Sequence, residues 1–206
     1  MNKQLSIINP SVSVNKILKD NLKIKVFEYY FNANESATLF DKLLNNTKWK
    51  NETVNVWGVK HSLRRRTAWY GDEGKSYSYS GITVLPNKWY KELLQIKNKI
   101  EEVTPIEFNS VLINDYLDGN IGMGWHSDDE KELGENPIIG SVSFGAERDF
   151  YLKSKQDSDR EKVKIKATNG SYILMMDNTQ HHWLHSIPIR KKIKDRRINL
   201  TFRKIL

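Results

Sequence analysis

Residues 137–176, PIIGSVSFGAERDFYLKSKQDSDREKVKIKATNGSYILMM, decide the fold class of this chain. Short apolar or alternating runs recur in this stretch, and Gly, Asn or charged residues separate them. We expect strands at residues 137–145, 148–153, 162–167 and 171–176. Short strands at this spacing are typical of a sandwich or barrel rather than of a doubly wound sheet. QDSDREK (156–162) is predicted to be an exposed hairpin loop.

The remaining elements surround this stretch. We expect further strands at IKVFEYYFN (24–32), SVLINDYL (110–117) and RINLTFR (197–203). Apolar residues at helical spacing predict helices over 35–46 and 87–103. The fold class is therefore mainly β with flanking helices (α+β).

The length of the chain and the polarity along it predict the domain organisation. Residues 1–23 are polar without a sustained period, and we interpret them as an N-terminal extension. The chain has 206 residues, so residues 24–206 suit a single domain. No segment is apolar and long enough to span a bilayer, so we expect no membrane partner.

Composition limits the chemistry. The chain has no cysteine, which excludes disulfides, thiolate metal sites and cysteine nucleophiles. Because the N-terminus also lacks the apolar core of a signal peptide, we expect an intracellular protein, nuclear if the source is a eukaryote and otherwise cytoplasmic. The net charge of +8 favours a polyanionic partner, nucleic acid above all, although a lysine-rich surface gives the same sum. The positive charge is concentrated in 57–66 and 190–206, and we expect the run 190–196 to be a groove wall touching phosphate.

Three residues form a candidate metal site. His126 and Asp128 stand two apart, so at the end of a strand both side chains point to the same face. His185 follows 57 residues after Asp128 and requires a neighbouring strand to bring it close. Two histidines and one carboxylate are the facial triad that holds Fe(II) and leaves positions open. The alternative is a surface turn, HSDDE, with a satisfied histidine.

A polar strand face accompanies this triad. In RINLTFR, Arg197, Asn199, Thr201 and Arg203 alternate with three apolar residues and therefore share one face. In SVLINDYL, Asn114 and Tyr116 share a face as well. An arginine fork is the natural bidentate partner of a carboxylate, so these two strands suit a dicarboxylate bound near a metal. The alternative is an ordinary half-exposed strand.

Four spaced blocks together resemble one enzyme family. N-D-Y-x-D-G (from Asn114), H-x-D (from His126), H-S-x-P-x-R (from His185) and R-x-N-L-T-F-R (from Arg197) resemble the AlkB-type Fe(II)/2-oxoglutarate dioxygenases, which are nucleic-acid dealkylases. The resemblance covers about Trp57 to Leu206 and is greatest to the eukaryotic branch that repairs duplex DNA.

The resemblance implies a double-stranded β-helix (jelly-roll) core over 108–206. It implies Fe(II) on His126, Asp128 and His185, which are also the catalytic residues, and O₂ as a co-substrate. It implies 2-oxoglutarate held by Asn114, Tyr116, Arg197, Asn199, Thr201 and Arg203. Within this set Arg203 is expected at the distal carboxylate and Arg197 near the metal. His181 and His182 are expected to have no ligand role.

The same resemblance implies an N-terminal nucleotide-recognition lid at 56–81. An enzyme that oxidises a base must extrude it from a duplex or act on single strands. The expected substrate contacts are Trp57, Gly58, Val59, Arg65, Tyr77, Ser78, Tyr79, Asp129 and Glu130. Trp57 is the expected wedge and Tyr79 the expected stacking residue, while Arg64, Arg65 and Arg66 are candidates for phosphate contacts.

The resemblance also implies the reaction. It is the oxidative demethylation of 1-methyladenine and 3-methylcytosine in DNA, with RNA as a second polymer, releasing formaldehyde, succinate and CO₂ as alkylation damage is repaired. We expect a monomer. Two alternatives remain open at this stage: a catalytically silent nucleic-acid-binding module on the same fold, and a 2-oxoglutarate oxygenase of a protein or small molecule.

Overall fold

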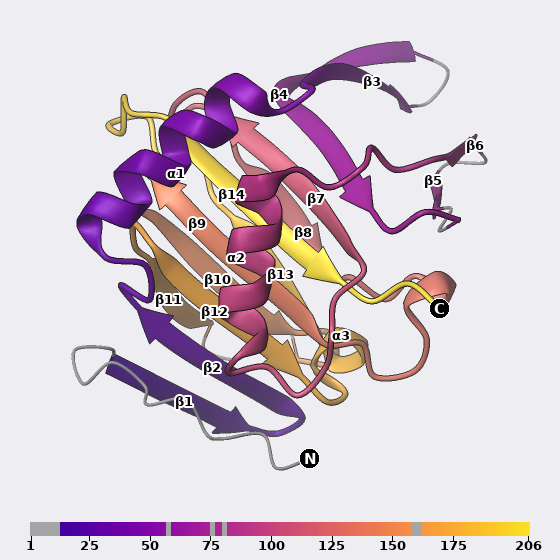
Figure 1. Cartoon of the computed structure of the whole chain (residues 1–206). Helices are drawn as coiled ribbons and strands as arrows, with labels where there is room; N and C mark the ends of the chain where they lie inside the picture. The colour runs from indigo at the N-terminus through magenta and orange to yellow at the C-terminus, as the bar shows by residue number, and fades with distance from the viewer. Residues whose placement is uncertain (1–12, 57–58, 75–76, 80–81, 158–161) are drawn as a thin grey trace, which may run out of the picture.

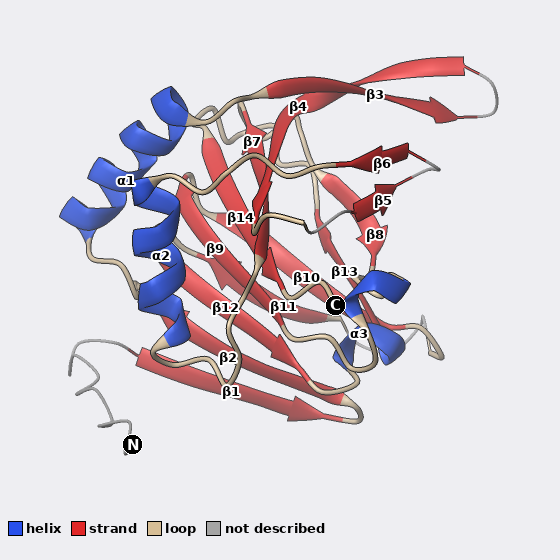
Figure 2. Cartoon of the chain, turned by 45° about the vertical axis from the view of Figure 1, so that its right-hand side comes forward, coloured by secondary structure: helices blue, strands red, loops and turns tan. Residues whose placement is uncertain are grey.

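Two antiparallel sheets face each other and two helices cover one side of the larger sheet (Figures 1 and 2). The structure, a computed structural model, describes residues 13–56, 59–74, 77–79, 82–157 and 162–206. All named strands in it pair in the antiparallel sense.

The larger sheet has eight strands in the order β1-β2-β12-β9-β14-β7-β4-β3. In that order they are Ser13–Lys19, Leu22–Glu28, Ser171–Met176, Ile139–Gly145, Arg197–Arg203, Ser110–Tyr116, Val59–Gly71 and Lys50–Val56. The smaller sheet has four strands in the order β11-β10-β13-β8. They are Val163–Ala167, Arg148–Ser154, Trp183–Ile187 and Met123–His126. A short hairpin pairs β5 (Tyr77–Tyr79) with β6 (Ile82–Val84).

The two long helices lie on the outer face of the larger sheet (Figure 1). Helix α1 (Ala33–Asn46) begins at a capping box, in which Asn32 and Glu35 exchange side-chain-to-backbone hydrogen bonds. Helix α2 (Lys91–Glu101) presents buried residues to the sheet. The two helices and the sheet share one apolar core, to which α1 contributes Leu39 and Leu43 and α2 contributes Ile96. Full burial of one such side chain contributes about 1.5–3 kcal/mol.

Strand β14 lies between that core and the space between the sheets. Ile198, Leu200 and Phe202 point to the helix side, where each is 0% exposed. Because side chains alternate along a strand, the four polar residues of β14 must point toward the smaller sheet. A second apolar cluster fills much of the space between the sheets, with contributions from β9, β10, β12 and β13. The first four residues of β14, Arg197 to Leu200, are therefore buried on both faces.

The jelly-roll prediction is confirmed, and so are most of the predicted strands. The strand at 171–176 and the strand at 197–203 have the predicted bounds. The helix predicted at 87–103 is shorter, since α2 spans only Lys91–Glu101.

Two predictions about the N-terminal half are wrong in part. The extension predicted at 1–23 does not hold for residues 13–23, which form β1 and the start of β2 at the edge of the larger sheet. Residues 1–12 lie outside the described part of the chain. The segment predicted as a lid, 56–81, is also partly scaffold, because β4 pairs with β7 from Arg66 to Gly71.

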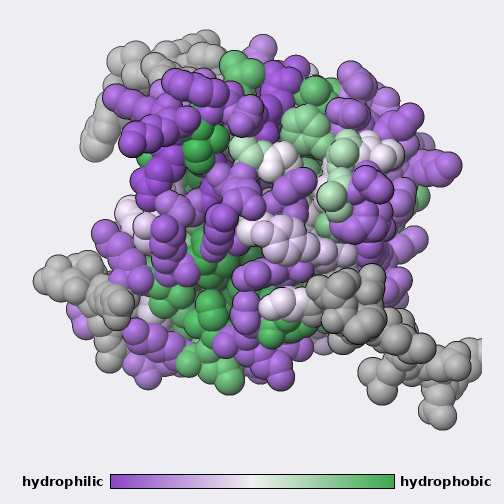
Figure 3. Space-filling model, turned by 90° about the vertical axis from the view of Figure 1, so that its left-hand side faces the viewer, coloured by the Kyte–Doolittle hydropathy of each residue, from purple (hydrophilic) through white to green (hydrophobic). Residues whose placement is uncertain are grey.

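The surface is mostly polar. Hydrophilic side chains dominate the face in Figure 3 and separate the hydrophobic ones into smaller groups. No helix among the described residues combines the length and apolar character needed to cross a membrane.

Candidate metal and dicarboxylate site

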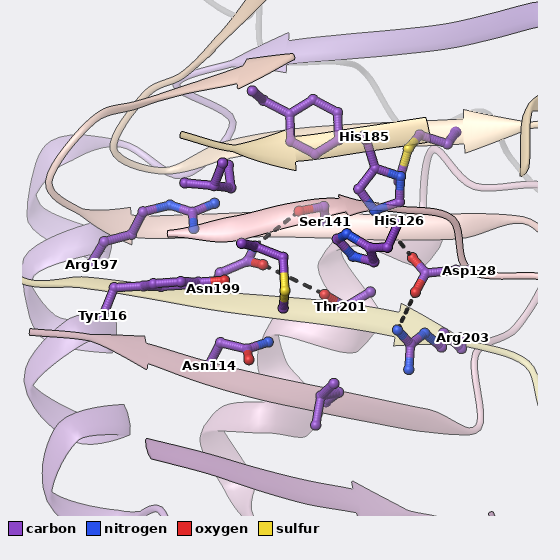
Figure 4. A pocket seen from close by; sticks show the side chains of 15 residues that line it. Asn114, Tyr116, His126, Asp128, Ser141, His185, Arg197, Asn199, Thr201 and Arg203 are labelled. Carbon is purple, nitrogen blue, oxygen red and sulfur yellow. Dashed lines mark hydrogen bonds and ion pairs between the residues drawn. The ribbon is translucent and has the colours of Figure 1, made fainter. Parts of the chain in front are cut away.

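A narrow cavity between the two sheets collects nearly all of the predicted metal and co-substrate residues (Figure 4). The larger sheet contributes Leu112, Asn114, Tyr116, Ser141, Met175, Arg197, Asn199, Thr201 and Arg203. The smaller sheet and the turn after β8 contribute Met123, His126, Asp128, Phe150, His185 and Ile187.

Strand pairing brings the three predicted metal ligands together. His185 on β13 is the register partner of His126 on β8, and their ring centroids are 4.2 Å apart. Asp128 follows two residues after His126, and its Oδ2 lies 3.7 Å from Nε2 of His185. One ligand atom from each residue lies within 4.8 Å of the other two. The predicted convergence is therefore confirmed, and the alternative of a surface turn is excluded.

Two contacts hold Asp128 in place. Its backbone N–H donates to Oε1 of Gln180 at 3.0 Å, and Gln180 is itself fully buried. Its Oδ1 accepts a short hydrogen bond from Nη2 of Arg203. Burial on its own would raise the pKa of Asp128, but the adjacent Arg203 cation, which also donates a hydrogen bond to it, outweighs this effect and lowers the pKa. The carboxyl group is therefore ionised at neutral pH.

His185 is held as a neutral imidazole. Burial lowers its pKa to about 4, and the nearby Asp128 opposes this shift only in part. Its ring also stacks on Phe150 with centroids 5.3 Å apart. A neutral imidazole nitrogen and an ionised carboxylate are the protonation states that a divalent metal requires of its ligands.

The middle of the cavity is a hydrogen-bonded polar row. Nδ2 of Asn199 donates to Oγ of Ser141 at 2.9 Å and to the carbonyl oxygen of Val142 at 2.8 Å. Oγ1 of Thr201 donates to Oδ1 of Asn199 at 3.5 Å, which is a weak contact. These bonds fix the side chains that line the path between the two ends of the cavity.

Arg197 forms the end of the cavity away from the metal ligands (Figure 4). It is 1% exposed, and its Nη2 donates to Oγ of Ser143 at 2.9 Å. Its Nε and Nη1 have no hydrogen-bond partner of acceptable geometry among the described residues. Burial lowers its pKa to about 10, and the adjacent Tyr116 partly offsets this shift. A buried guanidinium with two open donors is a receptor for an anion.

The predicted positions of the two arginines along the cavity are therefore wrong and must be exchanged. Arg203 lies at the metal end, because it bonds to Asp128. Arg197 lies six residues earlier on β14, and six residues of extended strand span about 20 Å. The distal carboxylate of a bound dicarboxylate would thus meet Arg197.

Two of the three predicted phosphate contacts, Arg65 and Arg66, have partners within the protein. Nε of Arg65 donates to Oδ1 of Asn114 at 2.9 Å, which places Arg65 beside the cavity. Arg66 forms an ion pair with the buried Asp115 at 2.7 Å and covers the Trp49 ring. The Arg66 guanidinium therefore serves the fold, and its prediction as a phosphate contact is not supported.

The other predicted substrate contacts have mixed outcomes. Trp57 and Gly58 lie outside the described residues. Val59 begins β4, while Tyr77, Ser78 and Tyr79 form β5. Their contacts with a base stay predictions.

Residues after the metal motif also have structural partners. Asp129 forms an ion pair with Lys155 at 2.8 Å, and Glu130 precedes a 3₁₀ turn at Lys131–Leu133. Nε2 of His181, in the short helix α3 (Thr179–His182), accepts the Asn136 N–H at 3.3 Å. Neither His181 nor His182 belongs to the metal cluster found among the described residues.

Several residues that hold the cavity side chains in place were not predicted from the sequence. Ser141 and Ser143 lie two apart on β9 and hold Asn199 and Arg197. Their i, i+2 spacing within PIIGSVSFG was the available signal. Gln180 carried no such signal, since nothing local shows that its amide reaches Asp128.

The basic run 190–196 is partly neutralised by carboxylates. Arg190 pairs with Asp149 at 2.7 Å, and Arg196 lies 3.3 Å from Asp115. Lys191 and Lys192 are exposed in the turn between them. Contact of this run with phosphate stays a prediction for those two lysines.

Comparisons with known proteins agree with the metal and dicarboxylate site described above. The profile of the 2OG-Fe(II) oxygenase superfamily matches residues 23–203. A Mus musculus protein named DNA oxidative demethylase ALKBH2 is 44% identical over 159 residues, which cover 74% of this chain and 66% of that protein. A Homo sapiens protein named alpha-ketoglutarate-dependent dioxygenase alkB homolog 3 is 36% identical over 191 residues, which cover 89% of this chain and 66% of that protein. This chain thus spans slightly less than two thirds of either relative.

A solved structure supports the fold alone. "The structure of OsALKBH1" superposes with a TM-score of 0.64 at 15% identity, covering 93% of this chain and all of that one.

Proposed function

Because the chain belongs to the 2OG-Fe(II) oxygenase superfamily, we propose that it is an Fe(II)- and 2-oxoglutarate-dependent dioxygenase that demethylates N-alkylated bases of DNA. The observation that carries the proposal is one cavity with a complete triad at one end and the buried Arg197 at the other. The name of the Mus musculus relative, a DNA oxidative demethylase, supports DNA as the substrate.

The residues present fit both cofactors. His126, Asp128 and His185 would hold Fe(II), since their ligand atoms converge, Asp128 is a carboxylate and burial keeps His185 a neutral imidazole. The two open donors of Arg197 would hold the distal carboxylate of 2-oxoglutarate. Bound together, iron, 2-oxoglutarate and O₂ supply the oxidising power that converts an N-methyl group to formaldehyde, while 2-oxoglutarate becomes succinate and CO₂.

The protein residues orient these groups and keep water away. Gln180 and Arg203 fix Asp128 from two sides, so its carboxylate cannot rotate away from the histidines. Ser141 and Ser143 hold the Asn199 and Arg197 side chains toward the cavity. Phe150, Met175 and Ile187 add apolar walls, which exclude water from the reacting groups.

The proposed lesions are 1-methyladenine and 3-methylcytosine. Their methyl groups lie on the Watson–Crick edge, so the base must leave the stack before it reaches a cavity between two sheets. The proposed lid for this extruded base is the segment 56–81, apart from the part of β4 that pairs with β7. Stacking on Tyr79 and wedging by Trp57 belong to the same proposal.

A formaldehyde assay tests this function. Matched single- and double-stranded DNA and RNA oligonucleotides that carry one lesion are incubated with the protein, Fe(II), 2-oxoglutarate and O₂. We expect stoichiometric formaldehyde and succinate from DNA, and none with His126→Ala. The His126→Ala variant should still bind the oligonucleotide, because it removes a metal ligand and not a phosphate contact.

The same assay separates the alternatives. A protein that binds DNA but converts no 2-oxoglutarate under any condition is a silent module, and the proposal is then wrong. Turnover of 2-oxoglutarate that methylated peptides stimulate and methylated DNA does not would indicate a protein oxygenase instead.

Location and assembly belong to the proposal as well. A DNA substrate requires an intracellular location, nuclear in a eukaryote, which imaging of the tagged chain tests. We propose a monomer because one chain supplies every residue that lines the cavity. Light scattering at micromolar concentration checks the monomer.

A further inference from the structure

The outer side of the smaller sheet has a groove of about 650 Å³ that the proposed reaction does not use. We call it the outer groove, and its principal lining residues are Trp125, Tyr151, Lys162, Ser186, Ile189 and Arg190. Trp125 is 37% exposed and Ile189 is 55% exposed, so apolar surface remains open to solvent there.

Strand alternation explains why this surface exists. On β10, Phe150 and Leu152 are buried in the core between the sheets, and Tyr151 between them points to the other side. Tyr151 is paired in register with Ser186 on β13 and with Lys164 on β11. One sheet therefore places metal ligands on its inner face and an aromatic, basic surface on its outer face.

Both aromatic rings of the outer groove lie beside cations. Nζ of Lys153 is 4.8 Å from the centroid of Trp125, and Nζ of Lys162 is 5.8 Å from it. The Tyr151 ring has Lys164 and Arg190 at 5.9 Å each. Aromatic rings interleaved with cations are the composition that binds single-stranded nucleic acid, through base stacking and phosphate contact.

The net charge of this surface favours an anion. Four cations, Lys153, Lys162, Lys164 and Arg190, surround the rings. Asp149 is the carboxylate that pairs with Lys164 at 3.0 Å and with Arg190 at 2.7 Å. Because one carboxylate offsets two of these cations only in part, the outer groove keeps a positive excess that complements a phosphate backbone.

The outer groove and the catalytic cavity share part of their walls. Met123 and Ile187 line both of them. Strand β8 is the edge of the smaller sheet, and Trp125 directly precedes the metal ligand His126. A polynucleotide with one base in the cavity thus has a short path around this edge to the indole.

We propose that the outer groove binds an unmodified, unpaired nucleotide of the same strand that carries the lesion. Its base stacks on Trp125, and its phosphates lie at Lys153 and Lys162. The nucleotide must be unpaired, since an indole reaches a base face only outside the duplex stack. This inference rests on the proposed function for the strand that enters the cavity.

Binding of unmethylated oligothymidylate tests the inference without turnover. Fluorescence anisotropy gives the Kd of labelled trimers and nonamers. We expect the nonamer to bind wild type more tightly than the trimer. Trp125→Ala should weaken nonamer binding about tenfold, the effect of losing one stacked base, while Trp125→Phe keeps most of the affinity. Leu94→Ala is the matched control. Leu94 is 39% exposed, and it lies on α2, which covers the larger sheet and contributes to neither the cavity nor the outer groove.

A second variant guards against misfolding. Lys153→Ala should lower the slope of log Kd against log salt by about 0.7, the value for one phosphate contact with a single strand. Equal nonamer affinity in Trp125→Ala and Leu94→Ala, or an unchanged salt slope in Lys153→Ala, overturns the inference.

Turnover then separates this inference from the function. On methylated trimers and nonamers, the fall in KM with length should be present in wild type and lost in Trp125→Ala. If no length is demethylated by wild type, the proposed function fails, whereas the anisotropy result still decides whether the groove binds a strand. If wild type demethylates both lengths and Trp125→Ala keeps the full length effect, the groove inference fails alone.

Discussion

Replacing Arg197 with methionine should separate co-substrate binding from fold stability. Methionine has a similar length and no charge, so it fills the same space at the distal end of the cavity. Arg197 is buried, with one hydrogen bond to Ser143 and two donors open among the described residues. These open donors predict that the guanidinium is kept for a ligand rather than for the fold.

The expected magnitude follows from those contacts. A hydrogen bond to a charged group contributes about 1.5–3 kcal/mol, so two of them contribute about 3–6 kcal/mol to binding 2-oxoglutarate. Since about 1.4 kcal/mol is a factor of ten, Arg197→Met should raise the Kd at least about 100-fold. The ligand-free variant should be no less stable, because the desolvation penalty of a buried ion is several kcal/mol, whereas the lost bond to Ser143 costs about 1–3 kcal/mol.

Thermal and chemical unfolding measure both effects. Mn(II) replaces Fe(II) so that no turnover occurs, and 2-oxoglutarate is added at 100 times the wild-type Kd. Wild type should gain about 2.7 kcal/mol of unfolding free energy, and a variant with a 100-fold weaker Kd should gain about 0.4 kcal/mol. Arg66→Met serves as the control, because Arg66 pairs with Asp115 and does not line the cavity. A Kd within tenfold of wild type, or a ligand-free variant that loses more than about 2 kcal/mol, would refute the reasoning.

Three further predictions concern an ion pair, a pair of glycines and a residue that orients a metal ligand. Glu35 forms an ion pair with Lys99 at 2.8 Å. Hydrogen bonds from Lys99 and a backbone N–H lower the pKa of Glu35 despite the opposing effect of burial, so its contribution to stability is present above the unfolded pKa and lost as pH falls through the folded pKa. Glu35→Gln should therefore lower the urea midpoint at pH 7 and flatten its fall between pH 5 and pH 2. Gly119→Ala should cost about 1–3 kcal/mol in urea unfolding, because a Cβ there collides with a backbone carbonyl, whereas Gly124→Ala meets nothing within 4 Å and should be neutral. Gln180→Leu should weaken metal binding about 10- to 100-fold in a Co(II) titration without loss of fold, because Gln180 orients Asp128; unchanged affinity contradicts that role.

The sequence was most informative where a strand has two different faces. The alternation of RINLTFR predicted that its polar residues share a face, and they do line one cavity. The direction of β14 relative to the metal is not encoded in that alternation. It depends on which end of β14 meets the turn after β8, and for this reason Arg197 and Arg203 were assigned to the wrong ends.

The N-terminal hairpin shows a different limit. Strand β1 is the edge of the larger sheet and most of its side chains are exposed, so its residues show no apolar period. Its position depends on pairing with β2, where Leu22, Ile24 and Val26 alternate and are buried. The strand signal was therefore present in the partner and absent from β1 itself.

Arg148 shows a kind of contact that cannot be predicted from the sequence. Arg148 is buried, and its guanidinium donates to the carbonyl oxygens of Ile121 and Pro188 at 2.9 and 2.7 Å. These contacts join two loops that are far apart in sequence. A backbone carbonyl has no residue-type signature, so no spacing rule predicts such a bond.

The positions of the buried arginines explain how the cavity selects a dicarboxylate. Arg203 is offset by Asp128, so the metal end carries no uncompensated cation before a metal binds. Arg197 has no carboxylate partner among the described residues, and Arg148 adds repulsion that further lowers its pKa. A monocarboxylate chelated at the metal would leave this distal cation buried and unpaired, at a cost of several kcal/mol. A dicarboxylate of the right length satisfies both ends at once, and that length is the distance from the metal ligands to the open donors of Arg197.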